Sequence, residues 1–344
     1  MGVNLKELMI KDETSISDLS NKKLVVDGNN ILYQFLATIR QMDGTPLMDS
    51  HGNVTSHLNG LFHRTTKLMH SGIKLCFVFD GKAPELKHAE RERRAELKKD
   101  AERRYEEAKK AEDTEEMKKY AQRTSRLTKE MIEEAVELIK AMGLPVVMAP
   151  SEGEAQAAYM VKKGESWAEI SQDYDCLLFG VPRMVQNLTI SEKKKRKDKL
   201  SYETVKPCVI DLEKNLKELG ISKKQLIAMG MLVGTDFNVG GVKGIGPKKA
   251  LTLIKKHGED LNAMFEEAGW KDNFDYPWTD VMKVFEEMPV KTEYTLKWER
   301  HDPAKVTELL VEKHDFSRER VEDTLEKMEK AQEKAGQKGL GDFM

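Results

Sequence analysis

Two apolar segments that each end in Asp-Gly constrain the fold most strongly. Residues 24–28 read Leu-Val-Val-Asp-Gly, and residues 75–81 read Leu-Cys-Phe-Val-Phe-Asp-Gly. In open α/β sheets, ligands bind outside the carboxyl ends of the strands. Asp-Gly is also a hairpin-turn signal, but residues 31–42 continue with helical spacing, which favours a strand-to-helix crossing. The sequence therefore predicts Asp27 and Asp80 at a functional edge of a sheet.

Further strand-like and helix-like segments alternate along the chain. A helical pattern at 54–71 precedes the strand at 74–79, and a second helical pattern at 127–142 precedes a short strand at 144–148. Another strand is expected at 167–171, although Glu169 makes it the weakest of the set. Such alternation is typical of an α/β fold with a mainly parallel central sheet flanked by helices. Residues 184–190 and 200–206 are expected to form two more strands.

The segment from residue 82 to 130 has a different character. Charges of both signs dominate, apolar residues are sparse and glycine is absent. Opposite charges three and four residues apart stabilise exposed helices, and helices that are polar all round do not pack into a core. The segment is expected to project from the body as a helical insertion, either with a function of its own or as a solvated insertion without one.

Composition limits the class of protein. The chain is 39% apolar and 34% charged with a net charge of −2, and it has neither a membrane-spanning run nor a signal-peptide pattern. Cys76, Cys176 and Cys208 lack metal-binding spacing, which favours a reducing compartment and argues against zinc. We expect a soluble intracellular protein without membrane contact. The basic tip at 192–199 could contact phosphate, direct nuclear import or be a solvated turn.

A second pair of carboxylates, Glu152 and Glu154, follows the expected strand at 144–148. Ser151 and Glu154 also have the spacing of a capping box, which is a purely structural helix start. A capping box would account for Glu154 but leaves Glu152 without a role, so both interpretations stay open.

Three more aspartates complete the set of candidate acidic ligands. Asp173 and Asp175 would point to one side of an extended segment, and Asp236 ends another apolar run. If all these carboxylates converged, repulsion would raise their pKa values unless cations neutralised them. Oxygen ligands without clustered His or Cys favour Mg²⁺ or Mn²⁺, and two such ions can clamp the oxygens of a phosphodiester during hydrolysis. The set comprises Asp27, Asp80, Glu152, Glu154, Asp173, Asp175 and Asp236.

A glycine-rich loop lies between helical patterns within residues 225–260. It reads Gly-Ile-Gly-Pro-Lys-Lys-Ala over residues 244–250, and its candidate DNA-binding residues are Gly244, Gly246, Lys248 and Lys249. The glycines allow close approach of a ligand to the backbone, and the next helix presents free N–H groups to a phosphate. This is the sequence form of a helix-hairpin-helix, which binds the DNA backbone, and it lacks the Gly-Lys-Ser/Thr of a nucleotide-binding loop. A plain Gly-Pro turn between helices is the alternative.

The last residues differ again in composition. Residues 329–344 are rich in Lys, Glu, Gln and Gly, which predicts a flexible tail. Residues 337–344 read Gln-Lys-Gly-Leu-Gly-Asp-Phe-Met, with apolar anchors at helical-turn spacing that fit a groove-binding peptide.

Taken together and in this order, the motifs closely resemble those of the flap endonucleases, the structure-specific 5′ nucleases of DNA replication and repair. The resemblance covers nearly the whole chain. It implies a nuclease core at 1–328, with a helical arch at 82–130 and a helix-hairpin-helix at 225–260. It also implies that the seven carboxylates bind two Mg²⁺, for which Mn²⁺ can substitute. The matching motifs are Met1-Gly2, Asp27 with residues 33–36, and residues 79–82, 149–155, 173–176 and 244–248.

The resemblance also implies roles for basic and aromatic residues. Lys87 and Arg94 match residues that contact the scissile phosphate at the base of the arch, through which the single-stranded 5′ flap passes. Tyr33 matches a residue that stacks on a base near the cut, and Arg40 and Arg64 fall where the family contacts DNA. The helix-hairpin-helix would hold the downstream duplex, in the family often through K⁺.

The terminal octet resembles a sliding-clamp binding peptide with Gln337, Leu340 and Phe343 as anchors. Met344 stands where an aromatic residue is usual, so weaker clamp binding is expected. The chain stops there, without the basic tail of eukaryotic members, which implies an archaeal type located in the cytoplasm or nucleoid, and a nuclear location only in a eukaryote. Nothing in the sequence indicates self-association, so a monomer is expected.

The resulting prediction is a Mg²⁺-dependent 5′ flap endonuclease and 5′–3′ exonuclease acting at single-strand/duplex DNA junctions, as in Okazaki fragment processing and repair. Two alternatives remain: a non-catalytic scaffold that bridges clamp and DNA, and a ribonuclease with a related core. Cleavage of a labelled flap with and without Mg²⁺, and of RNA against DNA flaps, distinguishes them.

Overall fold

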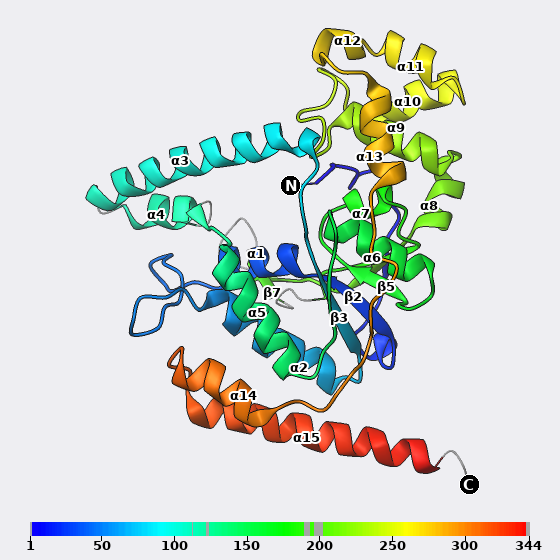
Figure 1. Ribbon diagram of the computed structural model, residues 1–344. Coiled ribbons are helices and arrows are strands. Elements are labelled where there is room, and N and C mark those ends of the chain that lie inside the picture. The colour runs from blue at the N-terminus through cyan, green and yellow to red at the C-terminus, as the bar shows by residue number, and fades with distance from the viewer. Residues whose placement is uncertain (1, 112, 122–123, 189–192, 196–201, 342–344) are drawn as a thin grey trace.

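A seven-stranded mixed sheet forms the centre of the computed structural model, which describes residues 2–111, 113–121, 124–188, 193–195 and 202–341 (Figure 1). The strand order is β1-β9-β6-β5-β2-β3-β4. Strands β6, β5, β2, β3 and β4 run parallel, whereas β9 pairs antiparallel with β6 and β1 pairs antiparallel with β9. The prediction of a mainly parallel sheet is confirmed. The strands are β1 (Asp12–Glu13), β2 (Lys23–Asp27), β3 (Lys74–Phe79), β4 (Val146–Met148), β5 (Ala168–Ile170), β6 (Arg183–Gln186) and β9 (Cys208–Asp211).

The two faces of the sheet carry separate hydrophobic cores. Leu24 and Val26 of β2 belong to one core and Val25, between them, belongs to the other, as expected for side chains that alternate along a strand. One core is covered by α1 (Gly28–Thr38), α2 (Ser56–His70) and α5 (Lys129–Ala141). The other is covered by α6 (Gly153–Lys162), α7 (Asp175–Leu178), α8 (Leu212–Leu219) and α9 (Lys223–Val233).

The predicted strand-to-helix crossing after Asp27 is present. Strand β2 ends at Asp27 and α1 begins at Gly28. Asp27 Oδ1 accepts a hydrogen bond from Asn30 N at 3.0 Å and so caps the helix. A Cβ at Gly28 would lie 2.6 Å from the ring of Phe79, so only glycine allows α1 to pack this closely on β3.

The charged insertion folds into helices that project from the body. Helices α3 (His88–Lys110) and α4 (Thr114–Ala121) extend away from the sheet in Figure 1. Ala101, Ala108 and Tyr120 are buried between them. The solvent-facing side carries the expected ion pairs, such as Arg103 with Glu107 at 3.0 Å. The helical prediction is confirmed, and the role of these helices as an arch stays a prediction.

Helices α9 and α10 (Pro247–His257) pack against each other, and residues 234–246 connect them. Gly240, Gly241 and Gly244 have φ angles of 82°, 64° and 78°, which favour glycine. Pro247 occupies the first turn of α10, where its missing N–H costs nothing. Beyond them, in yellow and gold in Figure 1, lie α11 (Leu261–Glu267), α12 (Trp270–Asn273) and α13 (Trp278–Glu287).

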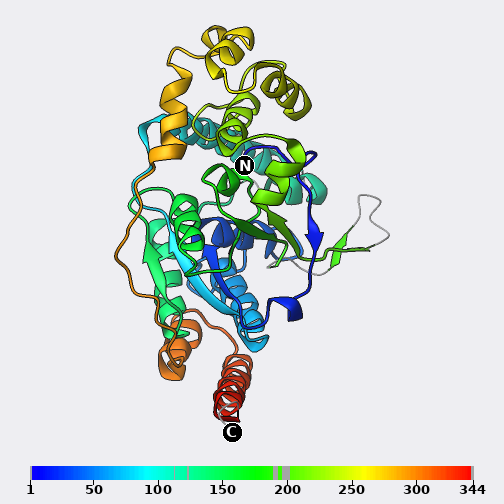
Figure 2. The same ribbon diagram turned by 90° about the vertical axis from the view of Figure 1, so that its right-hand side faces the viewer.

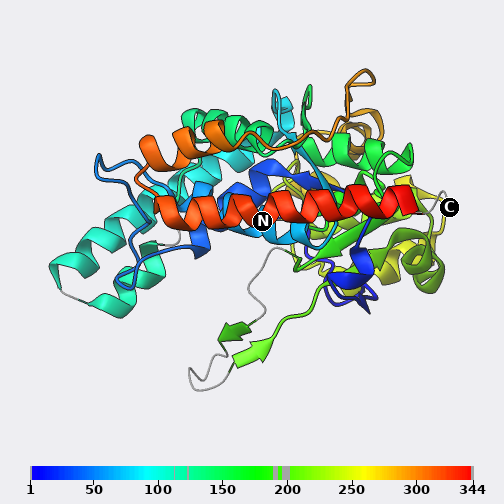
Figure 3. The ribbon, with the colours of Figure 1, turned by 90° about the horizontal axis from the view of Figure 1, so that it is seen from below.

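The C-terminal region differs from the sequence expectation. After α14 (Pro303–Thr307) and a π-helical turn at Glu308–Glu312, α15 runs from Arg318 to Gly341 along one side of the molecule (Figure 3). The expected flexible tail from residue 329 is therefore helical as far as Gly341, and residues 342–344 lie outside the described part. Its Lys, Glu, Gln and Ala residues are good helix formers, and Lys327 pairs with Asp323 four residues earlier.

A two-stranded ribbon carries part of the basic tip. Strands β7 (Lys193–Lys195) and β8 (Tyr202–Thr204) pair antiparallel and stand clear of the central sheet (Figure 2). The strand expected at 184–190 corresponds to β6, which ends at Gln186, and the one expected at 200–206 corresponds to β8, whereas β7 and β9 lie outside the expected ranges. Residues 196–199 of the tip lie outside the described part. Among the helices that the structure describes, none combines the length and apolar character needed to cross a bilayer.

Candidate functional site

The seven predicted carboxylates gather at the carboxyl edge of the sheet. Each follows a strand or stands at the start or end of a helix that borders this edge. Asp27 ends β2, Asp80 follows β3, Glu152 and Glu154 lie at the start of α6, Asp173 and Asp175 lie at the start of α7, and Asp236 follows α9.

Hydrogen bonds join carboxylates that are far apart in the sequence. Asn30 N donates to Asp27 Oδ1, and Asn30 Nδ2 donates to Asp173 Oδ2 at 2.7 Å, so one asparagine links the ends of β2 and β5. Val3 N donates to Asp175 Oδ1 at 2.8 Å. The N-terminal segment therefore lies directly against this cluster.

Asp80 is held by both neighbouring elements. Its Oδ1 accepts a hydrogen bond from Gly153 N at 2.6 Å, and its own N–H donates to Asn29 Oδ1 at 3.0 Å. A Cβ at Gly153 would lie 2.9 Å from Asp80 Oδ1, so a side chain there would displace the carboxylate. The start of α6 thus fixes the position of Asp80.

The two predicted catalytic cations reach the same cluster. Lys87 Nζ donates a hydrogen bond to Glu152 Oε2 and lies 3.5 Å from Asp236 Oδ2. Arg94 Nη2 lies 2.7 Å from Asp236 Oδ1. The base of the projecting helix α3 is therefore ion-paired with carboxylates from α6 and from the segment after α9.

Burial, together with the crowding of negative charge, raises the pKa values of several of these carboxyl groups. Burial, reinforced by the charge of Asp80, raises the pKa of Asp27 to about 8. Burial, reinforced by Asp236, raises the pKa of Asp175 to about 7. Burial and then the charges of Asp175 and Asp27 raise the pKa of Glu154 well above its usual value. Groups that influence one another in this way lie close together, and cations would stabilise their ionised forms.

The composition of the cluster fits divalent cations that prefer oxygen. It contains carboxylates without clustered His or Cys, which is the ligand set of Mg²⁺ and Mn²⁺. Within the described ranges, however, no group of three or more acidic, His or Cys side chains has its ligand atoms arranged to hold an ion. Glu152 and Asp236 are instead paired with Lys87 and Arg94. The oxygen donors of the cluster therefore fit Mg²⁺ or Mn²⁺. To coordinate an ion, Glu152 and Asp236 would have to turn away from Lys87 and Arg94.

One of the two open interpretations and one local expectation differ from the structure. The capping box is not formed: α6 has Glu152 at its N-cap without a side-chain cap, and Ser151 Oγ donates to Lys82 O at 2.9 Å. Nor are Asp173 and Asp175 in an extended segment, because Asp175 already begins α7. A turn, rather than strand alternation, brings these two aspartates to the cluster.

Sequence reasoning missed two contributors. Asn30 joins two of the carboxylates, and its only sequence signal is a polar pair of asparagines at the start of an apolar helix. In the sequence, Glu169 only weakens the prediction of a strand at 167–171. It is fully buried, and burial followed by the charge of Asp27 raises its pKa well above the usual value.

The three residues predicted to contact DNA lie on α1 (Tyr33), on α2 (Arg64) and in the segment between these helices (Arg40), and they differ in exposure. Tyr33 is 39% exposed, and Lys98 Nζ of α3 lies 5.4 Å from its ring centre, so it faces the space beneath the projecting helix. Arg40 is engaged internally: it donates to Gly44 O at 2.8 Å and to Ser125 Oγ. Arg64 is half-buried on α2. Tyr33 is therefore the best placed of the three.

The residues of the predicted helix-hairpin-helix are exposed. Gly244 and Gly246 lie in the loop before α10, and Lys248 and Lys249 lie in its first turn. A Cβ at Gly246 would meet no atom within 4 Å, so the backbone there is open to a ligand.

Two predicted clamp anchors fall in the last turns of α15, and one lies beyond it. Gln337 and Leu340 are within this helix, and Phe343 lies outside the described residues.

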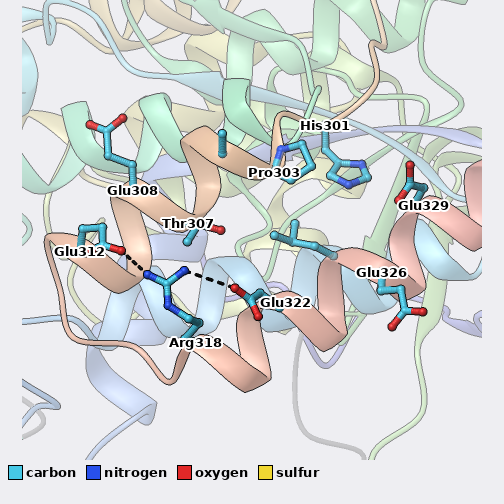
Figure 4. Close-up of a pocket in the computed structure, with 11 residues that line it drawn as sticks. His301, Pro303, Thr307, Glu308, Glu312, Arg318, Glu322, Glu326 and Glu329 are labelled. Carbon is cyan, nitrogen blue, oxygen red and sulfur yellow. Dashed lines mark hydrogen bonds and ion pairs between the residues drawn. The ribbon is translucent and has the colours of Figure 1, made fainter.

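A surface hollow of about 490 Å³ between α14 and α15 holds none of the predicted site residues (Figure 4). In it, Arg318 lies between Glu312 and Glu322, with Nη1 3.2 Å from Glu322 Oε1. Two of its acidic side chains are thus paired with Arg318, and the hollow differs in this respect from the carboxylate cluster at the sheet edge.

Known proteins are similar to this chain in both sequence and fold. The chain matches the XPG N-terminal domain over residues 1–101 and the XPG I-region over residues 143–236. It is 50% identical to flap endonuclease 1 of Hyperthermus butylicus, covering 96% of this chain and 95% of that protein, and 48% identical to that of Pyrococcus abyssi with the same coverage.

Solved structures agree with the sequence comparison. Flap endonuclease-1 from Methanococcus jannaschii has a TM-score of 0.76 at 41% identity, over 96% of this chain and 98% of that one. The catalytic core of Rad2 in complex with DNA substrate has a TM-score of 0.67 over 92% and 96%, and at 23% identity it shows the shared fold alone. The chain therefore belongs to the flap endonuclease family and is a structure-specific DNA nuclease.

Proposed function

We propose that this nuclease hydrolyses the phosphodiester at the junction of a single-stranded 5′ flap and duplex DNA, with two Mg²⁺ held by the seven carboxylates. The observation that supports this most is the gathering of these carboxylates around Lys87 and Arg94 at one sheet edge. When bound, the ions supply an activated water and stabilise the attacking and leaving oxygens. Mn²⁺, which has the same ligand preferences, should substitute for Mg²⁺.

Lys87 and Arg94 are proposed to act on the scissile phosphate. Without DNA, their charges neutralise Glu152 and Asp236. A phosphate that enters the cluster offers them a second anionic partner, and their charge then offsets the negative charge that develops on the phosphate during hydrolysis. Their release would also free both carboxylates to bind metal.

Substrate selection is assigned to the elements that surround this site. Helices α3 and α4 form the arch over the flap, with Tyr33 beneath it to stack on a base. The loop before α10, with Gly244, Gly246 and the following lysines, contacts the backbone of the downstream duplex, assisted by K⁺. Such contacts recognise the shape of the junction rather than base edges.

The cellular role proposed is Okazaki fragment processing and repair by a monomer in the archaeal cytoplasm or nucleoid. Gln337, Leu340 and Phe343 would bind the sliding clamp, with Met344 weakening this contact. Binding of a synthetic 337–344 peptide to the clamp tests this assignment, because Leu340→Ala should abolish it.

A cleavage experiment tests the proposal directly. A flapped duplex labelled at its 5′ end is incubated with the protein in EDTA, Mg²⁺ or Mn²⁺, beside an otherwise identical duplex with an RNA flap. We expect metal-dependent cuts at the junction that leave a 5′-phosphate and a 3′-hydroxyl. Cleavage in EDTA would contradict the metal assignment, and a preference for cutting within RNA would favour the ribonuclease alternative.

A further inference from the structure

Glu169 is a carboxylate in the interior of the central sheet. It lies in the middle of β5, pairs with Val25 of β2 and Met184 of β6, and is 0% exposed. Within the described part of the chain, neither of its carboxylate oxygens has a hydrogen-bond partner. Leaving a buried polar group without a hydrogen bond costs free energy, and an ionised carboxylate costs more than a neutral polar group.

The register of the sheet shows which way Glu169 faces. Paired residues of neighbouring strands share a face, so Glu169 lies on the side of Val25, where α6 and α7 pack. Asp27, two residues after Val25, points to the same side. Glu169 therefore sits one step below the carboxyl edge, between the sheet and the helix that carries Glu154.

The electrostatic neighbours of Glu169 agree with the position that the register gives. It raises the pKa of Glu154, and it is itself affected by Asp27. It also contributes to the raised pKa of Cys176, after the larger effect of burial. Its electrostatic neighbours are thus two candidate metal ligands, Asp27 and Glu154, and the thiol of Cys176, none of which is positive. Among the described residues, no Lys, Arg or His nitrogen lies within 4 Å of its carboxylate oxygens.

We infer that Glu169 is an eighth acidic residue of the metal centre, a positioning residue that strengthens divalent-ion binding from beneath Asp27 and Glu154. This inference rests on the proposed two-metal function. Bound cations would supply the positive charge that the surroundings of Glu169 lack, so metal binding would favour the ionised form of Glu169 and lower the free-energy cost of burying it. Glu169 acts through the ligands and through the field it adds, without contacting substrate.

The variant Glu169→Gln separates the effect of the charge from the effect of packing, because glutamine keeps the shape of the side chain and cannot ionise. Its melting temperature in EDTA at pH 8 should be higher than that of the wild-type protein. Mn²⁺, titrated calorimetrically without DNA, should bind several-fold more weakly, and the rise in melting temperature on adding Mn²⁺ should be smaller. The Mg²⁺ concentration that gives half-maximal flap cleavage should increase, with little change in the rate at saturating Mg²⁺.

Glu259→Gln is the matched control, since it removes one charge from an exposed loop beyond α10. If Glu169→Gln folds poorly, Glu169→Ala provides the same test. Mn²⁺ binding and half-saturating Mg²⁺ that match wild-type values in both variants would overturn the inference. If the wild-type protein itself shows no metal-dependent rise in melting temperature and no metal-dependent cleavage, the proposed two-metal function fails instead.

Discussion

Arg94 Nη2 lies 2.7 Å from one carboxylate oxygen of Asp236 and 2.9 Å from the other. This contact joins the base of the projecting helix α3 to the segment that follows α9. It places a permanent positive charge beside the acidic cluster, where a substrate phosphate would compete with Asp236 for the guanidinium. The helix that is proposed to guide the flap and the cluster that is proposed to cut it are therefore electrostatically coupled.

Neutralising either cation should slow the chemical step more than it weakens binding. We expect Arg94→Gln and Lys87→Met to lower single-turnover flap cleavage by about 100-fold or more, because each removes charge stabilisation from the transition state. Flap affinity, measured by fluorescence anisotropy in Ca²⁺, should change only a few-fold. Arg318→Gln, at the start of α15 and away from the elements proposed to bind DNA, is the control and should cleave normally. A near-normal rate for Lys87→Met would remove it from the catalytic machinery.

Removing a carboxylate should abolish cleavage while leaving the fold intact. Asp80→Ala and Asp175→Ala each delete a proposed metal ligand, so the cleavage rate should fall below detection although the flap still binds. Burial, reinforced by the charge of Asp236, raises the pKa of both carboxyl groups, so removing either group should not lower the melting temperature in EDTA. Asp280→Ala, on the exposed surface of α13, should retain full activity. Measurable turnover by either active-site variant would contradict the ligand assignment.

Stability of the metal-free protein should fall as the pH rises. The pKa is raised to about 8 for Asp27 and about 7 for Asp175 in the folded protein, against about 3.9 for aspartate in an unfolded chain. The folded state therefore retains protons that the unfolded state releases, which stabilises the fold at low pH. This stabilisation is lost as the pH rises from about 4 to about 8. Unfolding in EDTA should show a loss of roughly 2 kcal/mol or more from pH 6 to pH 8.5.

The variant Asp27→Asn checks that the cluster causes this slope. It cannot ionise, so its stability in EDTA should depend less on pH over the same range. Added Mg²⁺ should stabilise the wild-type protein more at pH 8.5 than at pH 6. An equally steep pH dependence in Asp27→Asn would assign the effect to other groups.

The sheet edge was predictable because strand ends carry strong local signals. Asp27 and Asp80 each follow an apolar run, and parallel strands in one sheet bring such ends together wherever they stand in the sequence. The approach of Lys87 and Arg94 followed from the family resemblance and not from spacing. Their contacts depend on how the base of α3 packs against the segment after α9, which local patterns do not specify.

Other features depend on tertiary packing and could not be predicted. Asn30 reaches Asp173 only because β2 and β5 are neighbours in the sheet. The order of the strands in the sheet cannot be read from their order in the sequence. Glu169 weakened the prediction of β5, since a charged residue is rare in a buried strand, yet the strand formed around it. The extension of α15 through Gly341 shows the opposite case, in which helix propensity outweighs a composition typical of disorder.

The loop before α10 gives a test of duplex binding that leaves the fold unchanged. Gly246 is the N-cap of α10 with a φ of −95°, and an added Cβ would meet no atom within 4 Å, so Gly246→Ala should fold normally and lose at most about 1 kcal/mol of stability, because alanine caps a helix less well than glycine. If the DNA backbone approaches this glycine closely, the extra methyl group should weaken binding to a nicked duplex several-fold. Gly244→Ala is the contrasting variant, since its φ of 78° strains any other residue by about 1–2 kcal/mol and should lower stability. Unchanged duplex affinity in Gly246→Ala, measured at low salt where phosphate contacts are strongest, would place the DNA elsewhere.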